Sequence, residues 1–199
     1  MRKLILQVQM TLDGFIAGPN GEMDFMEMNW GKDIQTYVKD LTDPVGTIVL
    51  GRKLAEGFIP YWASVARNTD NPEVEAGKKF TNTPKVVFTK TLKASDSQMA
   101  EWNNTVLASD LVKAITDLKN KSESEGDIIA YGGAMFVSSL IKHELIDEFH
   151  FFINPTAIGN GLPIFKELNS KQNLKLVKST AFDCGIVVLN YTLSPIKKK

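Results

Sequence analysis

Short apolar runs recur along this chain, and polar or glycine-rich segments follow most of them, which predicts a series of short strands. In the first run, residues 4–10, Gln7 and Gln9 occupy alternate positions between apolar residues. The other predicted strands are 47–50, 85–89, 105–107, 127–131, 148–153, 174–181 and 186–193. Helical spacing of apolar residues predicts helices over 33–41, 110–121 and 135–142, and a further helix is expected to begin after Gly51.

The order of these elements predicts the fold class. Strands and helices alternate through most of the chain, which is typical of a mostly parallel sheet with helices on both faces. The last two strands are joined around 182–185, so they are expected to form an antiparallel hairpin at one edge. Residues 66–84 are polar and contain Asn71-Pro72 and Gly77, which predicts a surface excursion with one helical turn. No repeat or linker divides the chain, so we expect one α/β domain over 1–199.

The composition narrows the class of protein. The 199 residues are 43% hydrophobic and 23% charged, as in ordinary globular proteins. The 23 basic and 23 acidic residues cancel, so no global positive charge favours nucleic acid or a membrane surface. One cysteine excludes an intrachain disulfide, and two histidines make a metal site unexpected. No apolar stretch approaches ~20 residues, so we expect a cytoplasmic enzyme or binding protein.

Three predicted strand ends carry groups that suit an anion: Gly51-Arg52-Lys53, Thr89-Lys90-Thr91 and Gly132-Gly133. The carboxyl ends of parallel strands share one edge of a sheet, and a helix that begins there offers free backbone N–H groups to phosphates. A dinucleotide with an additional phosphate would use all three segments. Each segment alone has a simpler interpretation, because glycine pairs also turn corners and cations at strand ends are often only solvated. The first strand lacks a following Gly-x-Gly-x-x-Gly, which argues against the usual NAD-binding fold.

Several short motifs resemble, in their order and spacing, the dihydrofolate reductase-like superfamily, and most of all the branch related to the riboflavin-biosynthesis reductase domain of RibD. The motifs are Thr11-Leu12-Asp13-Gly14-Phe15-Ile16-Ala17-Gly18, Leu50-Gly51-Arg52-Lys53, Thr89-Lys90-Thr91-Leu92, Tyr131-Gly132-Gly133-Ala134, Leu145-Ile146-Asp147-Glu148, Pro155, Ile158-Gly159-Asn160-Gly161 and Phe165. The resemblance covers almost the whole chain. It implies a three-layer dihydrofolate reductase-like fold, NADPH as hydride donor, and a homodimer.

The resemblance also implies roles for individual residues in holding NADPH. The residues concerned are Ile16 and Ala17 at the nicotinamide end, Gly51, Arg52 and Lys53 at the phosphates, Thr89 and Lys90 at the adenosine 2′-phosphate, and Gly132, Gly133 and Ala134 along the diphosphate and nicotinamide. One position departs from the family pattern. Leu54 stands where members commonly have threonine, which removes a hydroxyl that often contacts the cofactor phosphate.

The substrate side is harder to read from the sequence. Asp33 opens the first predicted helix, roughly where dihydrofolate reductases place a substrate-binding carboxylate, so we expect it to anchor an amino-pyrimidine edge. An acidic residue in the first turn of a helix can also serve only the helix dipole. The candidates for an aromatic wall are Trp30, Tyr37, Phe58, Tyr61 and Trp62. Aromatic residues more often pack a core, which is the interpretation favoured for Phe58.

The function expected on these grounds is NADPH-dependent reduction of a small nitrogen heterocycle of the pyrimidine or pterin type. It would be related to 5-amino-6-(5-phosphoribosylamino)uracil reductase or dihydrofolate reductase. The alternative is a non-catalytic nucleotide-binding or regulatory protein that retains the NADPH site.

Overall fold

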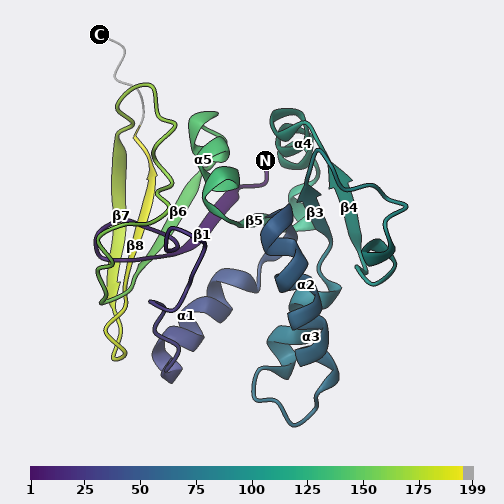
Figure 1. Cartoon of the computed structure of the whole chain (residues 1–199), viewed down its shortest axis with the longest axis horizontal. Helices are drawn as coiled ribbons and strands as arrows, with labels where there is room; N and C mark the ends of the chain where they lie inside the picture. Colours follow the sequence, from purple (N-terminus) through teal and green to yellow (C-terminus); the bar gives the residue numbers. More distant parts are fainter. Residues whose placement is uncertain (195–199) are drawn as a thin grey trace.

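The computed structural model describes residues 1–194 and contains one eight-stranded sheet in the order β4-β3-β2-β5-β1-β6-β8-β7 (Figure 1). The strands are β1 (Leu4–Met10), β2 (Val45–Gly51), β3 (Lys85–Phe88), β4 (Thr105–Ala108), β5 (Asp127–Tyr131), β6 (Glu148–Ile153), β7 (Leu174–Ala181) and β8 (Val187–Leu193). Strands β1 to β6 pair in parallel, and the β7–β8 hairpin joins β6 antiparallel. The predicted mixed sheet with an antiparallel hairpin at its edge is therefore confirmed.

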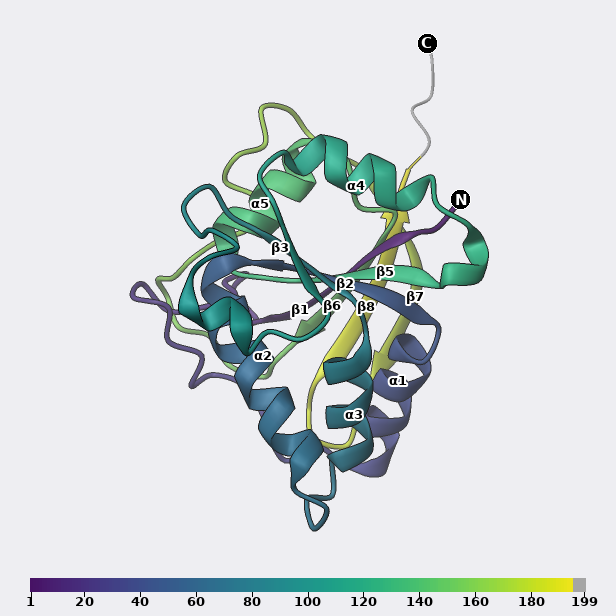
Figure 2. The same ribbon diagram turned by 90° about the vertical axis from the view of Figure 1, so that its right-hand side faces the viewer.

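Helices cover both faces of the sheet and make three layers (Figure 2). They are α1 (Lys32–Thr42), α2 (Arg52–Arg67), α3 (Val74–Asn82), α4 (Leu111–Lys119) and α5 (Ala134–Lys142), with short 3-10 turns at Ser97–Ala100 and Glu123–Glu125. The layer of α1, α2 and α3 lies on one face, and the layer of α4 and α5 lies on the other. Within residues 1–194, none of these helices has the length and apolar character needed to cross a membrane.

The alternation of side chains along β1 divides the core between the two faces. Leu4, Leu6, Val8 and Met10 pack with α4 and α5, whereas Ile5 packs with α2. This two-residue period is the one expected for a strand buried on both sides. Gln7 and Gln9 therefore face the layer of α1 and α2.

Helix α3 corrects the prediction for residues 66–84. The segment forms a nine-residue helix rather than a single helical turn. Phe80 is buried and packs with Phe58 and Trp62 of α2, at centroid distances of 5.6 and 4.5 Å. A Cβ on Gly77 would lie 2.6 Å from the backbone nitrogen of Ala66, so glycine lets the two helices approach closely. One aromatic and one glycine thus anchor a helix whose other residues are mostly polar.

Candidate cofactor and substrate site

Two helices begin at the carboxyl edge of the parallel strands without side-chain caps. Gly51 is the N-cap of α2 and Gly133 is the N-cap of α5, and neither helix has an acidic residue in its first turn. Because β2 and β5 are neighbours in the sheet, these two N-termini lie at adjacent strand ends. The arrangement offers two sets of free backbone N–H groups, with the positive ends of two helix dipoles, to an anion.

The glycines at this edge differ in what requires them. An added Cβ would lie 2.9 Å from Phe136 at Gly51 and 2.4 Å at Gly132, so both glycines allow the Phe136 ring to pack against the strand ends. The same Cβ on Gly133 would meet nothing within 4 Å. Gly133 is therefore the position where the backbone is open to a ligand.

The cationic residues gather at the same edge. Arg52 donates from Nε to Glu56 at 2.8 Å and from its terminal nitrogen to the Thr91 hydroxyl at 2.5 Å, which links α2 to the loop after β3. The Thr89 hydroxyl accepts the backbone N–H groups of Thr91 and Leu92, so it orders this loop. Lys53 and Lys90 are exposed and make no ion pair within residues 1–194. Their ammonium groups are available to phosphates.

Ile16 and Ala17 lie in a buried segment beside residues 161–163. The backbone N–H of Ile16 donates to Leu162 at 3.1 Å, and that of Leu162 donates to Ala17 at 2.8 Å. Gly161 permits this contact, because a Cβ there would lie 2.4 Å from the Ala17 carbonyl oxygen. Ala134 is also buried, in the first turn of α5. These residues form a wall near the ends of β1 and β5.

Asp13 holds the loop that supports this wall. Its carboxylate accepts the backbone N–H groups of Ile158 at 3.1 Å and Gly159 at 2.6 Å. A hydrogen bond from the Thr11 side chain and these backbone donors lower the pKa of Asp13. Asp13 therefore stays ionised and ties the loop after β1 to the loop after β6.

Leu54 is partly buried and packs against the cluster formed by α2 and the sheet. The departure from the family pattern is thus a packing residue in this chain.

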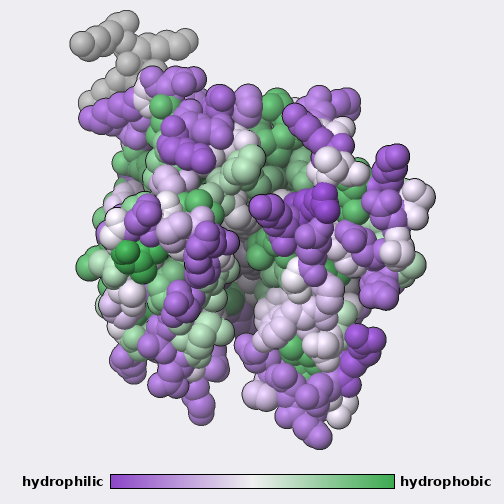
Figure 3. All heavy atoms as spheres, viewed as in Figure 1, coloured by the Kyte–Doolittle hydropathy of each residue, from purple (hydrophilic) through white to green (hydrophobic). Residues whose placement is uncertain are grey.

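A cleft lies over β1 on the face of α1 and α2. The buried residues of α1 pack on β6 and β8, and those of α2 pack on β2, β3 and β5, so the carboxyl half of β1 lies beneath the gap between the two helices. Figure 3 shows the molecule hollowed between the half that carries α1 and the hairpin and the half that carries α2 and α3. Gln7 and Gln9 lie on β1 on this face of the sheet, and we call them the floor glutamines.

Both floor glutamines bond to neighbouring polar side chains through their oxygens. The Gln7 oxygen accepts the Tyr131 hydroxyl at 3.0 Å, and the Gln9 oxygen accepts the amide N–H of Asn154 at 2.9 Å. Asn154 is fully buried. In the sequence, its position directly before Pro155 indicates only a turn, so the residue would not be singled out there. The sequence feature that points to this hydrogen-bonded group is the presence of two polar residues, Gln7 and Gln9, in an otherwise apolar central strand.

Asp33 lies at the start of α1, on the side of the terminal hairpin. Its Oδ2 accepts the backbone N–H of Asp183 at 3.0 Å, and this bond lowers the pKa of Asp33. The carboxylate is thus engaged with the hairpin turn, and the structure does not bring it against the floor glutamines. Its role as a substrate anchor stays a prediction.

The candidate aromatic wall is divided between α2 and the segment that comprises Trp30 and α1. Trp30 and Tyr37 pack against Phe152 on the α1 side, and Trp62 packs against Phe58 and Phe80 on the α2 side. These side chains are half-buried, so each contributes to a core cluster and leaves part of its surface at the cleft or the solvent.

A buried hydrogen-bonded group fastens α1 to the sheet. The Tyr37 hydroxyl lies 2.7 Å from Nδ1 of His150, and Nε2 of His150 lies 2.8 Å from a Glu148 carboxylate oxygen. The bonds from His150 and Asn190 lower the pKa of Glu148 to about 2, and burial raises the pKa of Tyr37 to about 12. Glu148 is therefore ionised and accepts from Nε2–H of His150, while Nδ1 of the same ring is in hydrogen-bond contact with the Tyr37 hydroxyl.

This group predicts a pH-dependent contribution to stability. A carboxylate whose pKa falls from 4.5 to about 2 on folding stabilises the protein above pH 4.5, and that stabilisation is lost as the pH falls toward 2. We expect Glu148→Gln to lower the free energy of unfolding by ~2 kcal/mol at pH 7, and the difference from wild type to shrink between pH 4.5 and 2. Urea unfolding of both proteins across this pH range measures the difference in the free energy of unfolding. A difference that does not change with pH would contradict the prediction for Glu148.

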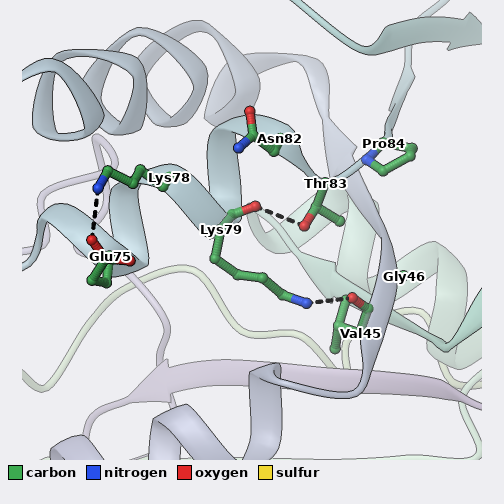
Figure 4. A pocket seen from close by; sticks show the side chains of 8 residues that line it. All are labelled: Val45, Gly46, Glu75, Lys78, Lys79, Asn82, Thr83 and Pro84. Atoms are coloured by element: carbon green, nitrogen blue, oxygen red, sulfur yellow. Dashed lines mark hydrogen bonds and ion pairs between the residues drawn. The ribbon is translucent and has the colours of Figure 1, made fainter.

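A pocket of about 480 Å³ lies at the opposite edge of the sheet, near the starts of β2 and β3 (Figure 4). Lys79 spans it and donates to the carbonyl oxygens of Asp43 and Val45 at 3.0 and 2.9 Å. Lys78 and Glu75 form an ion pair at its rim. Lys79 is thus engaged by backbone and Lys78 by Glu75, and the pocket is separate from the edge where α2 and α5 begin.

The three layers, the strand order and the site at the carboxyl edge define a dihydrofolate reductase-like α/β protein. Residues 2–188 match the RibD C-terminal domain family, and the chain belongs to this family. The Bacillus subtilis proteins YyaP and YwjB, both described as uncharacterised, are similar to it. YyaP is 33% identical over 96% of this chain and 94% of its own length, and YwjB is 28% identical over 91% and 92%.

Solved structures share the fold at lower identity. A putative riboflavin biosynthesis protein from Shewanella sp. PV-4 matches 98% of this chain and 100% of its own, with a TM-score of 0.70 and 21% identity. Acinetobacter baumannii RibD matches with a TM-score of 0.67 and 17% identity, over 98% of this chain and 59% of RibD. Enterococcus faecalis dihydrofolate reductase, in a complex with NADP(H), matches 97% of both chains with a TM-score of 0.60 and 14% identity.

Proposed function

We propose that this protein is an NADPH-dependent reductase of a small nitrogen heterocycle of the pyrimidine or pterin type. The observation that carries the proposal is the pair of uncapped helix N-termini at Gly51 and Gly133, with Arg52, Lys53 and Lys90 at the same edge. Membership of the RibD C-terminal domain family supports an oxidoreductase. A structural neighbour from Thermotoga maritima is described as a deaminase and 5-amino-6-(5-phosphoribosylamino)uracil reductase.

The residues at the carboxyl edge fit a phosphorylated dinucleotide. In this proposal the N-terminus of α5, at Gly132, Gly133 and Ala134, holds the diphosphate, because Gly133 is open to a ligand. Gly51, Arg52 and Lys53 contribute the second helix N-terminus and two cations. Thr89 and Lys90 hold the 2′-phosphate, and Ile16 and Ala17 wall the nicotinamide end. When bound, NADPH would supply the hydride, and the protein would supply orientation and electrostatics.

The substrate side of the proposal uses the cleft over β1. The half-buried residues of α1 and α2 wall the cleft, and the ordered loops around Asp13 and Gly161 close its end near Ala17. A planar heterocycle held there would lie next to the nicotinamide end, which is the alignment that hydride transfer requires. We also propose a cytoplasmic homodimer with a single domain over 1–199, as the family resemblance implies.

Oxidation of NADPH tests the function directly. Purified protein is mixed with NADPH and a panel of pterins, folates and ribosylaminopyrimidines, and absorbance at the nicotinamide wavelength is followed. We expect one class of heterocycle to support NADPH consumption. Saturable NADPH binding without consumption across the panel would instead favour the non-catalytic nucleotide-binding alternative.

The loop after β3 gives a prediction about the preference of the protein for NADPH over NADH. Lys90 is exposed and makes no ion pair within residues 1–194, so its ammonium is available to the phosphate that distinguishes NADPH from NADH. We expect Lys90→Ala to raise the Kd for NADPH by ~10-fold, since a charged hydrogen bond contributes ~1.5 kcal/mol or more, and to leave that for NADH almost unchanged. Lys93→Ala is the matched control, because Lys93 is an exposed lysine of the same loop. Equal losses for both cofactors would contradict this assignment of Lys90.

A further inference from the structure

We propose that the free amide groups of Gln7 and Gln9 make the cleft selective for a heterocycle that presents carbonyl oxygens, rather than amino groups, toward β1. The inference deepens the proposed reductase function and rests on it, because it concerns the substrate half of the same site. It starts from two polar side chains on a central strand whose other residues are apolar. Burying polar groups costs free energy unless each finds a partner, so the partners of these two amides indicate their use.

The orientation of the Gln9 amide follows from its neighbour Asn154. The oxygen of the Asn154 side chain accepts the backbone N–H of Glu27 at 2.8 Å, so its nitrogen faces the opposite way. That nitrogen carries two protons and has three acceptors: the Gln9 oxygen at 2.9 Å and the carbonyl oxygens of Phe152 at 3.1 Å and Met10 at 3.2 Å, so one proton is shared between two of them. The contact to Gln9 is the shortest of the three, and a nitrogen that only donates requires the acceptor atom of Gln9 there. The Gln9 oxygen is therefore committed to Asn154, and its NH₂ group is the free end.

Gln7 is oriented by Tyr131 in the same sense. Burial raises the pKa of Tyr131, so its phenol keeps a proton that needs an acceptor. The hydroxyl lies 3.0 Å from the Gln7 oxygen and donates to it. Reversing the Gln7 amide would leave the phenol proton without this acceptor, which is costly in a buried position.

Both amide nitrogens remain without a protein partner. Neither makes a hydrogen bond within the part of the chain that the structure describes, and neither is among its fully enclosed unpaired polar atoms. Gln9 is half-buried and Gln7 is 9% exposed, and an unpaired nitrogen that is not fully enclosed keeps some accessible surface on the face of β1 that carries α1 and α2. Positions i and i+2 of a strand lie ~7 Å apart on one face. Two donors at this spacing complement carbonyl oxygens or ring nitrogens along one edge of a planar ring.

A preference for amino groups would instead need a hydrogen-bond acceptor at the floor of the cleft. A ligand edge made of amino groups is usually met by a carboxylate, as expected above for Asp33. The Asp33 carboxylate lies at the hairpin turn, where its Oδ2 accepts the backbone N–H of Asp183. In this proposal the amide donors of Gln7 and Gln9 set the polarity of the floor.

Two matched probes test this polarity in the wild-type protein. Pteridine-2,4-dione and 2,4-diaminopteridine have the same ring system and differ only in carbonyl or amino groups at two positions. We expect the dione to bind at least ~10-fold more tightly, measured by fluorescence titration, because an unpaired polar contact costs about this factor. Equal affinities, tighter binding of the diamino compound, or no binding of either at millimolar concentration would overturn the proposal.

The variant Gln9→Glu changes only the free end of the side chain. A glutamate at position 9 still accepts from Asn154, but its second oxygen is an acceptor where the amide was a donor. We expect this variant to lose at least ~10-fold in affinity for the dione and to gain relative affinity for the diamino compound. Gln9→Met, similar in volume and without polar groups, should remove the preference without reversing it. Thermal unfolding verifies that each variant is folded, and an unchanged dione preference in folded Gln9→Glu would refute the role of Gln9.

NADPH titrations of the same proteins separate this inference from the proposed function. Gln7 and Gln9 lie on the cleft floor rather than at the helix N-termini, so NADPH affinity should be similar in all of them. A protein that binds NADPH but prefers the diamino probe would retain the reductase proposal and lose the selectivity proposal. A protein that prefers the dione but does not bind NADPH would retain the selectivity proposal and lose the reductase proposal.

Discussion

The variant Gly133→Asp is expected to fold normally and to lose NADPH binding by ~100-fold or more, since the charge opposes the diphosphate directly. Gly133 is the N-cap of α5 with φ −71° and ψ 166°, which any residue can adopt, and a Cβ there meets nothing within 4 Å. Aspartate is among the preferred N-cap residues and suits the positive end of a helix dipole. Stability should therefore be unchanged or rise by a few tenths of a kcal/mol.

Binding suffers because the same N–H groups cannot serve two anions. The introduced carboxylate would occupy the donors proposed for the diphosphate and would repel it. Gly133→Asn is the matched comparator, because asparagine has nearly the same shape and caps a helix equally well without a charge. We expect the asparagine variant to weaken NADPH binding less than the aspartate variant does. Wild-type NADPH affinity in folded Gly133→Asp, measured by calorimetric titration, would exclude the α5 N-terminus from the cofactor site.

The largest effect on stability is expected from Gly46→Ala, near the start of β2. A Cβ at this position would lie 1.5 Å from the backbone carbonyl oxygen of Glu125, just before β5, where the parallel pairing of β2 with β5 has an irregularity. The obstructing atom belongs to the backbone, so no side-chain rotation can relieve the contact. We expect a loss of ~3 kcal/mol or more in the free energy of unfolding, which corresponds to a fall of roughly 10 °C in Tm.

Gly57→Ala provides the control for this substitution. Gly57 is exposed inside α2, and a Cβ there meets nothing within 4 Å. Replacing an exposed helical glycine by alanine should stabilise the protein by ~0.5–1 kcal/mol. Chemical unfolding of both variants measures the contrast. A Gly46→Ala protein as stable as wild type would show that the chain before β5 does not lie as close to Gly46 as described.

The sheet could be predicted from sequence because its central strands are buried on both faces. Val49, Ile129 and Phe152, for example, lie in continuous apolar runs, and such runs indicate parallel strands without knowledge of their partners. The convergence of Gly51, Thr89 and Gly133 at one edge then follows from the parallel order alone. Helix α3 was mispredicted because its packing depends on Phe80 and Gly77 meeting another helix, which a local pattern does not reveal.

The substrate half of the site could not be predicted for a different reason. The partners that orient it are far apart in sequence: Gln9 and Asn154 are separated by 145 positions, and Asp33 and Asp183 by 150. Gln7 and Gln9 could be recognised as polar residues in a strand, but only their bonds to Tyr131 and Asn154 decide which end of each amide is free. The direction of these hydrogen bonds depends on which side chains meet in the folded protein, so it cannot be predicted from the sequence pattern.

The central claim is that the carboxyl edge of the sheet is an NADPH site. Titration of the purified protein with NADPH and NADH, followed by calorimetry, tests it most directly. The account predicts saturable binding of one NADPH per chain, a rise in Tm on binding, and weaker binding of NADH. Folded protein that shows no saturable binding of NADPH up to millimolar concentration would contradict it.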